Sequence, residues 1–219
     1  MPIKIKSLTI GPFATNAYLL ADTQTANAIL IDPVDDAPAI LAAARGEGWA
    51  IKLMIATHAH LDHLLASAAI KQALNIPFYI HEDCEALLAE IPMQGLFFGL
   101  GDLPAAARPD RLLTSESETI ELDAIRLQSV YTPGHAPGHL SFYLPEHKIL
   151  FSGDTLFAGS IGRTDLPGGD HALLMRSIID KLMILDDDVR VLPGHMGITT
   201  IGRERQSNPF LLAHDDSRA

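Results

Sequence analysis

One stretch decides how this chain can be interpreted, Thr57-His58-Ala59-His60-Leu61-Asp62-His63. It follows the apolar run Leu53 to Ala56, which predicts a buried strand. A turn at the end of such a strand can direct several imidazoles and a carboxylate into one small volume. Nitrogen and oxygen ligands without a thiolate suit zinc, iron or manganese. The spacing lets His58 and His60 serve one ion, while Asp62 and His63 would face a neighbouring ion.

Three later segments repeat the design of a strand followed by a metal ligand. They place His135 after Thr132-Pro133-Gly134, Asp154 after Ser152-Gly153, and His195 after Leu192-Pro193-Gly194. Each segment alone is weak, because Pro-Gly turns are common and a single His or Asp is usually structural. Together with the first stretch they supply seven ligands from four strand ends. A histidine-rich surface turn, the alternative for the first stretch, does not explain this set.

Composition limits the classes of protein that the chain can belong to. With 219 residues, 47% hydrophobic and 20% charged, it predicts one soluble globular domain over residues 1–219. The net charge of −11 argues against nucleic acid or an anionic membrane as a partner. The single cysteine, Cys84, excludes an intramolecular disulfide. Without a signal-peptide core or a membrane-spanning apolar run, we expect a cytoplasmic protein.

Hydrophobic patterns predict strands and helices in two similar halves. Strands are expected at 3–10, 16–22, 27–32, 51–56, 78–80, 119–122, 125–131, 140–144, 149–152 and 189–192, and helices at 36–45, 64–74, 82–90 and 170–185. Residues 91–110, rich in Gly and Pro, are expected to form a loop that either covers a site or packs on the core. Two facing sheets between helices would make a four-layer α/β/β/α fold, with the ligands meeting at one edge.

The order of the ligands resembles that of a known family. His-x-His-x-Asp-His, followed by single His, Asp and His residues at strand ends, is similar to the metallo-β-lactamase superfamily, and the likeness runs from Asn16 to Phe210. The finer pattern resembles the short bacterial form of hydroxyacylglutathione hydrolase (glyoxalase II). The matching segments are residues 132–138, 152–157, 162–165, 199–202 and 208–210.

The resemblance implies a fold and a ligand set. The fold would be the αββα sandwich, with the site at one edge between the sheets. One metal would be held by His58, His60 and His135, the other by Asp62, His63 and His195, and Asp154 would bridge the two. Two cations about 3.5–4 Å apart need a bridging anion between them and lower the pKa of a shared water. Zinc is the expected metal, and iron or manganese also fits.

The resemblance also implies a reaction. A metal-bridging hydroxide would hydrolyse a small-molecule thioester, S-D-lactoylglutathione, to D-lactate and glutathione, with Asp62 and Asp154 as the catalytic carboxylates. Arg163 could bind a substrate carboxylate bidentately, or pair structurally with Asp165. The long form of glyoxalase II carries a further C-terminal helical region that helps bind glutathione. This sequence ends about ten residues after the Asn-Pro-Phe at 208–210.

Several residues outside the ligand set are expected to support the metal site or the apolar core. His139 is expected as a buried polar residue, not a ligand, and Cys84 as a buried core thiol. Asn16 and Asp32 either support the site through hydrogen bonds or serve only as turn residues. Met196 stands where relatives more often have Gly, which would reshape the wall beside the second metal.

Other functions compete with thioester hydrolysis. A persulfide dioxygenase-like enzyme would use a single iron held by two His and one Asp, but that branch tends to carry Pro-Ala-His where this chain has Pro-Gly-His at 193–195. A lactonase or other ester hydrolase is a third option, since the same hydroxide attacks any activated carbonyl. β-Lactamase activity is disfavoured because Asp154 stands where many zinc β-lactamases have Cys. A metal-stabilised binding protein is the non-enzymatic alternative, and the complete ligand set argues against it.

Overall fold

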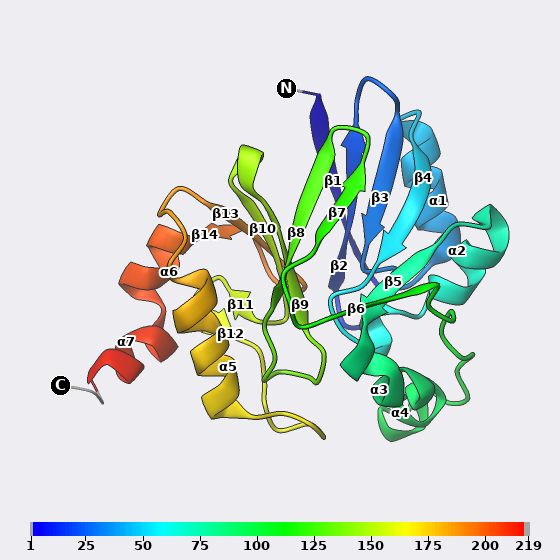
Figure 1. Ribbon diagram of the computed structural model, residues 1–219. Coiled ribbons are helices and arrows are strands. Elements are labelled where there is room, and N and C mark those ends of the chain that lie inside the picture. The colour runs from blue at the N-terminus through cyan, green and yellow to red at the C-terminus, as the bar shows by residue number, and fades with distance from the viewer. Residues whose placement is uncertain (1, 217–219) are drawn as a thin grey trace.

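Residues 2–216, the part of the chain that the computed structural model describes, form two six-stranded sheets that face each other (Figure 1). The strands of the first sheet lie side by side in chain order. They are β1 (Ile3–Ile10), β2 (Thr15–Asp22), β3 (Asn27–Ile31), β4 (Ala50–Ile55), β5 (Phe78–His81) and β6 (Arg111–Leu113). The first three strands pair antiparallel, and from β3 to β6 the pairing is parallel.

The second sheet has the order β14-β13-β10-β9-β8-β7. Its strands are β7 (Thr119–Leu122), β8 (Ile125–Tyr131), β9 (Leu140–Leu144), β10 (Ile149–Gly153), β13 (Arg190–Pro193) and β14 (Thr199–Thr200). Only β10 and β13 pair in parallel among the described strands of this sheet. A small hairpin of β11 (Leu156–Phe157) and β12 (Ser160–Ile161) follows β10.

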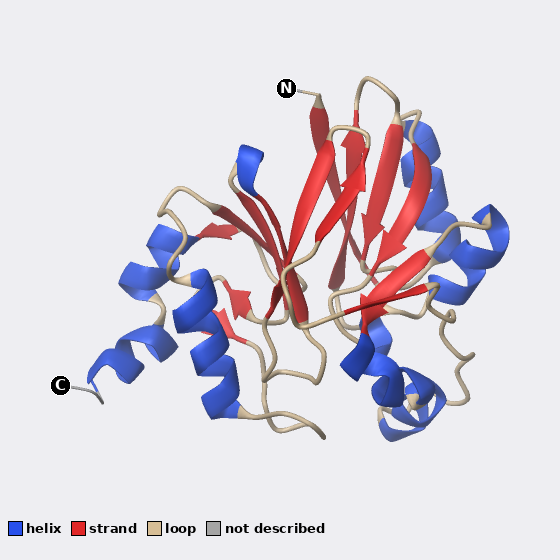
Figure 2. Ribbon diagram, viewed as in Figure 1, coloured by secondary structure: helices blue, strands red, loops and turns tan. Residues whose placement is uncertain are grey.

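Helices lie on the outer side of each sheet (Figure 2). The first sheet is covered by α1 (Ala37–Gly46), α2 (Ser67–Leu74), α3 (Glu85–Ala89) and α4 (Ile91–Phe97), and the second by α5 (His171–Ser177), α6 (Ile201–Ser207) and α7 (Pro209–Asp216). Single 3₁₀ turns lie at Leu61–His63, Glu82–Cys84 and Pro145–His147, and a π-helical turn at Ile178–Leu182. The predicted four-layer α/β/β/α fold is therefore confirmed.

Three apolar cores fill the spaces between the four layers. Strand β2 contributes to two of them, because successive side chains of a strand point to opposite faces. Ala17, Leu19 and Ala21 pack toward the helices of the first half. Tyr18 and Leu20 pack toward the second sheet, where the Tyr18 ring meets Phe151 edge-on at 5.2 Å between centroids. Burial on both faces is the reason why the central strands of the first sheet read as continuous apolar runs.

Most predicted elements are present with small shifts at their ends. The helix predicted at 170–185 begins as expected, and the Asp170 carboxylate caps it by accepting a hydrogen bond from the Leu173 backbone N–H at 2.9 Å. The α-helix then ends at Ser177, and a π-helical turn continues it to Leu182. The short strands β6, β11, β12 and β14 and the helices α6 and α7 were not predicted, because they lack a long periodic pattern.

The expectation of a loop over residues 91–110 is wrong for its first part. Residues 91–97 form α4 instead. Pro92 is compatible with this helix because it lies in the first turn, where proline needs no N–H partner. Gly95 lies against the loop that folds back after α4, so that a Cβ atom there would lie 2.6 Å from the Leu103 side chain. The remaining segment divides between the two expected roles: Ala107 packs in the core, and Phe98 lines a pocket.

Within residues 2–216, no helix is both long and apolar enough to cross a membrane. Cys84 is fully buried, as expected, and burial raises the pKa of its thiol to about 12. Its Sγ lies 3.4 Å from the Gly138 carbonyl oxygen. This cysteine is therefore held as a neutral thiol in the core.

A buried carboxylate ties α6 to the β11–β12 hairpin. Glu204 accepts hydrogen bonds from the Gly159 backbone N–H, the Thr199 hydroxyl and the Asn208 amide. Asn208 also donates to the Ser160 carbonyl oxygen at 3.0 Å. A buried charge is tolerated only with such complete pairing.

We predict that Glu204→Ala lowers the free energy of unfolding by about 3 kcal/mol, because it leaves buried donors without acceptors. Urea denaturation followed by circular dichroism measures this change. Glu121→Ala is the matched control, since this side chain is 56% exposed, and we expect a change within about 0.5 kcal/mol. Equal effects of the two substitutions would contradict the structural role of Glu204.

Candidate metal centre

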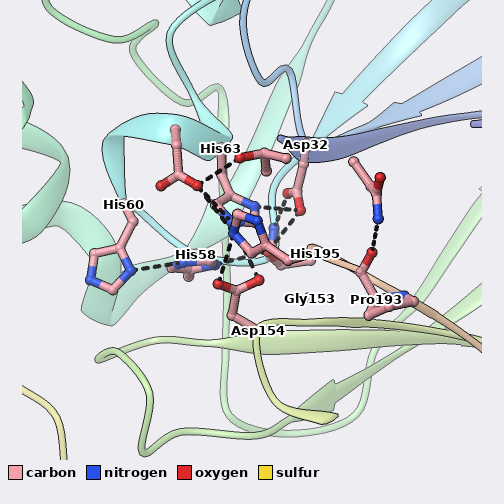
Figure 3. A network of polar contacts seen from close by, with 12 residues as sticks. Asp32, His58, His60, His63, Gly153, Asp154, Pro193 and His195 are labelled. Carbon is pink, nitrogen blue, oxygen red and sulfur yellow. Dashed lines mark hydrogen bonds and ion pairs between the residues drawn. The ribbon is translucent and has the colours of Figure 1, made fainter. Parts of the chain in front are cut away.

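The seven predicted donors come together at one edge of the two sheets. Figure 3 shows His58, His60, His63, Asp154 and His195 among them. Four of them follow β4 in the turn that contains the 3₁₀ segment Leu61–His63. His135 follows β8, Asp154 follows β10 and His195 follows β13. The strand ends of both halves thus face one volume, as the sequence predicts.

The first cluster consists of His58, His60 and His135. The Nδ1 atom of His60 lies 3.0 Å from Nε2 of His58 and 2.9 Å from Nε2 of His135. All three rings are buried. Three ring nitrogens that converge at this distance form one face of a coordination polyhedron for a divalent cation.

The second cluster consists of Asp62, His63 and His195. Oδ2 of Asp62 lies 3.2 Å from Nε2 of His195 and 3.5 Å from Nε2 of His63. Asp154 lies between the clusters: its carboxylate oxygens are 3.4 Å from His63, 3.3 Å from His195 and 3.6 Å from Nε2 of His135. One carboxylate therefore faces donors of both clusters.

Hydrogen bonds on the far side of the imidazoles set their tautomers. The Nδ1 atom of His63 lies 2.9 Å from the Asp32 carboxylate, and because a carboxylate only accepts, Nδ1 carries the proton. Thr57 donates its hydroxyl to Asp32, so that its oxygen accepts from Nδ1 of His58 at 3.0 Å. When these rings are neutral, as at a bound cation, the lone pair of each Nε2 atom points into the site, the arrangement that metal-binding histidines use.

Backbone carbonyl oxygens set the tautomers of the two donor histidines in the second half. The Nδ1 atom of His135 donates to the Arg163 carbonyl oxygen at 2.7 Å, and Nδ1 of His195 to the Phe13 carbonyl oxygen at 3.2 Å. Asn16 donates its amide to the carbonyl oxygens of Pro193 and Met196 and so holds the turn that carries His195. The supporting role expected for Asn16 is therefore present in the structure.

Asp32 serves the site through an unusual backbone conformation. Its φ of 54° lies in the left-handed region, which few residues other than glycine adopt. The carboxylate accepts from the Thr57 backbone N–H and contacts Nδ1 of His63. We infer that the local strain is maintained because this carboxylate positions two neighbouring segments of the site.

His139 lies behind the clusters and is not one of their donors. Its Nε2 atom accepts a hydrogen bond from the Asp154 backbone N–H at 3.0 Å, and its Nδ1 atom lies 2.9 Å from the Thr132 hydroxyl. The ring is fully buried, and burial holds its pKa well below the usual value. A neutral His139 thus positions the Asp154 backbone, in agreement with the expectation of a buried polar residue.

The two clusters differ in their electrostatics. Burial lowers the pKa of His60 to about 3 and those of His58 and His135 below the usual range, so this cluster offers neutral nitrogens at pH 7. Burial would also lower the pKa of His195, but Asp154 and Asp62 raise it to about 10. The carboxylates therefore attract a positive charge to the second cluster.

Glycines allow close packing of the turns that carry the donors in the second half. Gly134, at φ 129°, passes so close to α5 that a Cβ atom would lie 2.2 Å from the Leu174 backbone nitrogen. A Cβ atom on Gly194 would lie 2.1 Å from Oδ1 of Asp154. These positions explain why the Pro-Gly-His turns in the sequence carry glycine before each histidine.

The residues fit a divalent metal by an independent criterion. Among the residues that the structure describes, Nε2 of His63 and Oδ1 of Asp154 are buried and have no hydrogen-bond partner. Such atoms cost free energy unless a further group pairs with them. A cation between the donors would pair with both.

Five of the seven donors line a pocket of about 650 Å³ between the two halves, namely His60, Asp62, His135, Asp154 and His195. Apolar side chains form much of its wall, namely Phe13, Leu61, Phe98, Phe157, Ile161, Leu166 and Met196. Arg163 also lines the pocket, but its guanidinium makes two hydrogen bonds of 2.7 Å to the Asp165 carboxylate. Of the two roles weighed for Arg163, the ion pair is the one present in the structure.

Comparisons with known proteins agree with this geometry. Residues 10–195 match the metallo-beta-lactamase superfamily. The chain belongs to this superfamily. Hydroxyacylglutathione hydrolase GloC of Haemophilus influenzae is 38% identical over 95% of this chain and 98% of its own length.

Two solved structures of this superfamily are similar over nearly the whole chain. The B3 metallo-beta-lactamase BLEG-1 superposes with a TM-score of 0.89 at 38% identity, covering 95% of this chain and 99% of its own. TTHA1623, in a di-iron-bound form, has a TM-score of 0.85 at 39% identity, covering 94% of this chain and all of its own. The two solved structures share the fold, while the names of the relatives state different things: a hydroxyacylglutathione hydrolase, a B3 metallo-beta-lactamase and a di-iron-bound form.

Gln94 of α4 supports the site and was missed by the sequence analysis. Its Oε1 atom accepts from the Leu61 backbone N–H at 2.9 Å, and its Nε2 atom donates to the carbonyl oxygens of Ala59 and Leu87. The amide thus holds the backbone on both sides of His60 against α3 and α4. No signal in the sequence distinguishes this glutamine, since it lies in a segment that predicts a loop.

We predict that Gln94→Ala weakens the affinity of the protein for zinc by about tenfold, because the turn that carries His60 loses two hydrogen bonds, at Ala59 and Leu61, and α3 loses a third at Leu87. Competition with a chromophoric chelator measures the affinity. Gln206→Ala, an exposed glutamine in α6, is the matched control and should leave the affinity unchanged. An affinity of Gln94→Ala within twofold of the parent protein would contradict this role.

Proposed function

We propose that this protein is a metal-dependent hydrolase of thioesters, with S-D-lactoylglutathione as its substrate. The observation that carries the proposal is the pair of donor clusters with Asp154 between them, in an open pocket. The similarity to hydroxyacylglutathione hydrolase GloC supports the substrate class. The seven donors that this geometry brings together are His58, His60, Asp62, His63, His135, Asp154 and His195.

The proposal assigns two divalent metals to the site, and zinc is the metal that we propose. The His58, His60 and His135 cluster would hold one, and the cluster with Asp62 would hold the other. Bound there, divalent cations would lower the pKa of a water molecule and withdraw electrons from the substrate carbonyl. The di-iron form of TTHA1623 makes iron the first alternative to test.

The chain's own residues prepare the site for this chemistry. Burial would raise the pKa of Asp62, but His63, His195 and Thr15 outweigh it and lower that pKa to about 2, so the carboxylate is ionised at neutral pH. The Thr15 hydroxyl donates to Oδ2 of Asp62 at 2.8 Å and fixes its orientation. We assign Asp62 to accept a proton from the attacking water. Because a thiolate is a good leaving group, the reaction needs no strong general acid.

A covalent mechanism through cysteine does not fit the structure. Cys84 is buried, its pKa is raised to about 12 by burial, and its thiol contacts the carbonyl oxygens of Pro137 and Gly138. A thiol in this state is a poor nucleophile. Hydrolysis by a water molecule at the donor clusters is therefore the favoured route.

We expect purified, metal-analysed protein to hydrolyse S-D-lactoylglutathione, followed as loss of thioester absorbance. Chelation should remove the activity and added zinc should restore it, because the proposed reaction depends on metal held by these donors. Two bound metals without turnover would contradict the substrate assignment. A single iron, with oxygen uptake in the presence of glutathione persulfide, would instead support the dioxygenase alternative.

Asp154→Ala should abolish turnover, a loss of at least about 1,000-fold in kcat, because it removes the carboxylate that faces both clusters. Steady-state kinetics and metal stoichiometry are measured together, with circular dichroism as the test of folding. Asp186→Ala, whose side chain is 72% exposed, is the control and should retain full activity. Near-normal turnover by folded Asp154→Ala would refute the mechanism.

A second candidate reaction is the hydrolysis of β-lactams, and the similarity to BLEG-1 is the observation that favours it. The same donors would serve an attack on a strained amide carbonyl. Hydrolysis of the chromogenic cephalosporin nitrocefin separates the two candidates. Turnover of nitrocefin that exceeds turnover of the thioester would make β-lactam hydrolysis the leading function.

A further inference from the structure

A second hollow of about 150 Å³ lies beside the pocket that holds the metal donors. Apolar side chains from α3, α4 and the turn before α5 form most of its wall, namely Leu87, Met93, Phe97, Phe98, Leu166 and Pro167. We call it the side pocket. Nothing in the proposed chemistry of the metal donors uses these side chains.

The side pocket is continuous with the donor pocket. Four residues line both: His60, Gln94, Phe98 and Leu166. His60 is one of the proposed metal ligands, so a substrate whose reacting carbonyl lies at the donors can extend one substituent past this ring into the side pocket. The Phe98 ring also meets Phe13 edge-on at 5.7 Å, which continues the apolar wall across the donor pocket.

The apolar side chains around the side pocket are exposed to solvent. Phe97 is 75% exposed and Met93 63% exposed, and Phe98 is partly exposed beside them. Clustered large apolar side chains on a protein surface commonly mark a binding site. Covering them with a hydrocarbon group would stabilise a complex in proportion to the apolar area removed from water.

The charge at the side pocket does not favour an anionic substituent. Glu90 lines the side pocket. Among the described residues that line the donor pocket, Arg163 is the one lysine or arginine, and its guanidinium is paired with Asp165. A carboxylate in the side pocket would meet a negative charge and no free cation.

We propose that the side pocket binds an apolar substituent of the thioester, a hydrocarbon or aryl group attached either to the scissile carbonyl or to the leaving sulfur. This inference rests on the proposed thioesterase function and adds a specificity to it. Thioesters with such a substituent are then better substrates than S-D-lactoylglutathione. Phe97 and Met93 are the residues that determine this preference.

Two substrate series test the proposal with metal-loaded protein. In the first, glutathione is constant and the acyl group grows from acetyl to butyryl and hexanoyl. In the second, the acetyl group is constant and the thiol grows from ethanethiol to hexanethiol. We expect kcat/KM to rise by about fourfold per added methylene in one series until the side pocket is filled. The series that rises tells whether the acyl group or the thiol occupies the pocket.

A pair of surface variants assigns the effect to the side pocket. Phe97→Ser should reduce the ratio of kcat/KM for the longest and shortest substrates by about tenfold or more. Ile184→Ser is the matched control, since Ile184 is 73% exposed and lies outside the residues that line either pocket, and its ratio should stay unchanged. Met93→Trp should also lower the ratio, because the larger side chain fills the pocket.

Flat kcat/KM values in both series would overturn the proposal, as would equal ratios in Phe97→Ser and Ile184→Ser. These results differ from a failure of the proposed function itself. In that case the metal-loaded protein would hydrolyse no thioester of either series, the shortest included.

Discussion

The burial of seven proposed metal-donor side chains at one sheet edge is the constraint on which the rest of the structure depends. Five imidazoles and two carboxylates meet at one sheet edge, with donor atoms about 3 Å apart in the first cluster. Such a group is costly to bury, because polar atoms like Nε2 of His63 lack a partner among the described residues. The fold must hold these atoms in place by contacts from behind.

Those contacts come from both halves of the molecule. Asp32, at the end of β3, directs His63 and Thr57, and Asn16 of β2 donates to carbonyl oxygens beside His195 in the other half. Tyr18 also donates its hydroxyl to the Pro193 carbonyl oxygen at 2.7 Å. The same strand that fills the core between the sheets therefore sets the distance between the donor turns. Packing and site geometry are coupled through β2.

Helix α4, which lies outside the strand ends, forms another part of the site. Helix α4 contributes Gln94, which holds the turn around His60, and Phe97 and Phe98, which surround the side pocket. One short helix thus both supports a proposed metal ligand and presents the surface that we propose for substrate selection. The chemistry that we propose depends on the strand ends, whereas specificity depends on the apolar side chains of α4, which can vary as long as Gln94 keeps its contacts with the donor turn.

The sequence alone determined the donors, their order and the four-layer fold, because these depend on short-range patterns: a buried strand, then a turn with His or Asp. Cys84, His139 and the cap at Asp170 were predictable for the same reason. Only the tertiary structure decided that residues 91–97 form a helix, that Gln94 reaches the donor turn, and that Arg163 pairs with Asp165. These features depend on contacts with segments distant in the chain, or on a choice between equally good partners. Local residue patterns carry no information about either.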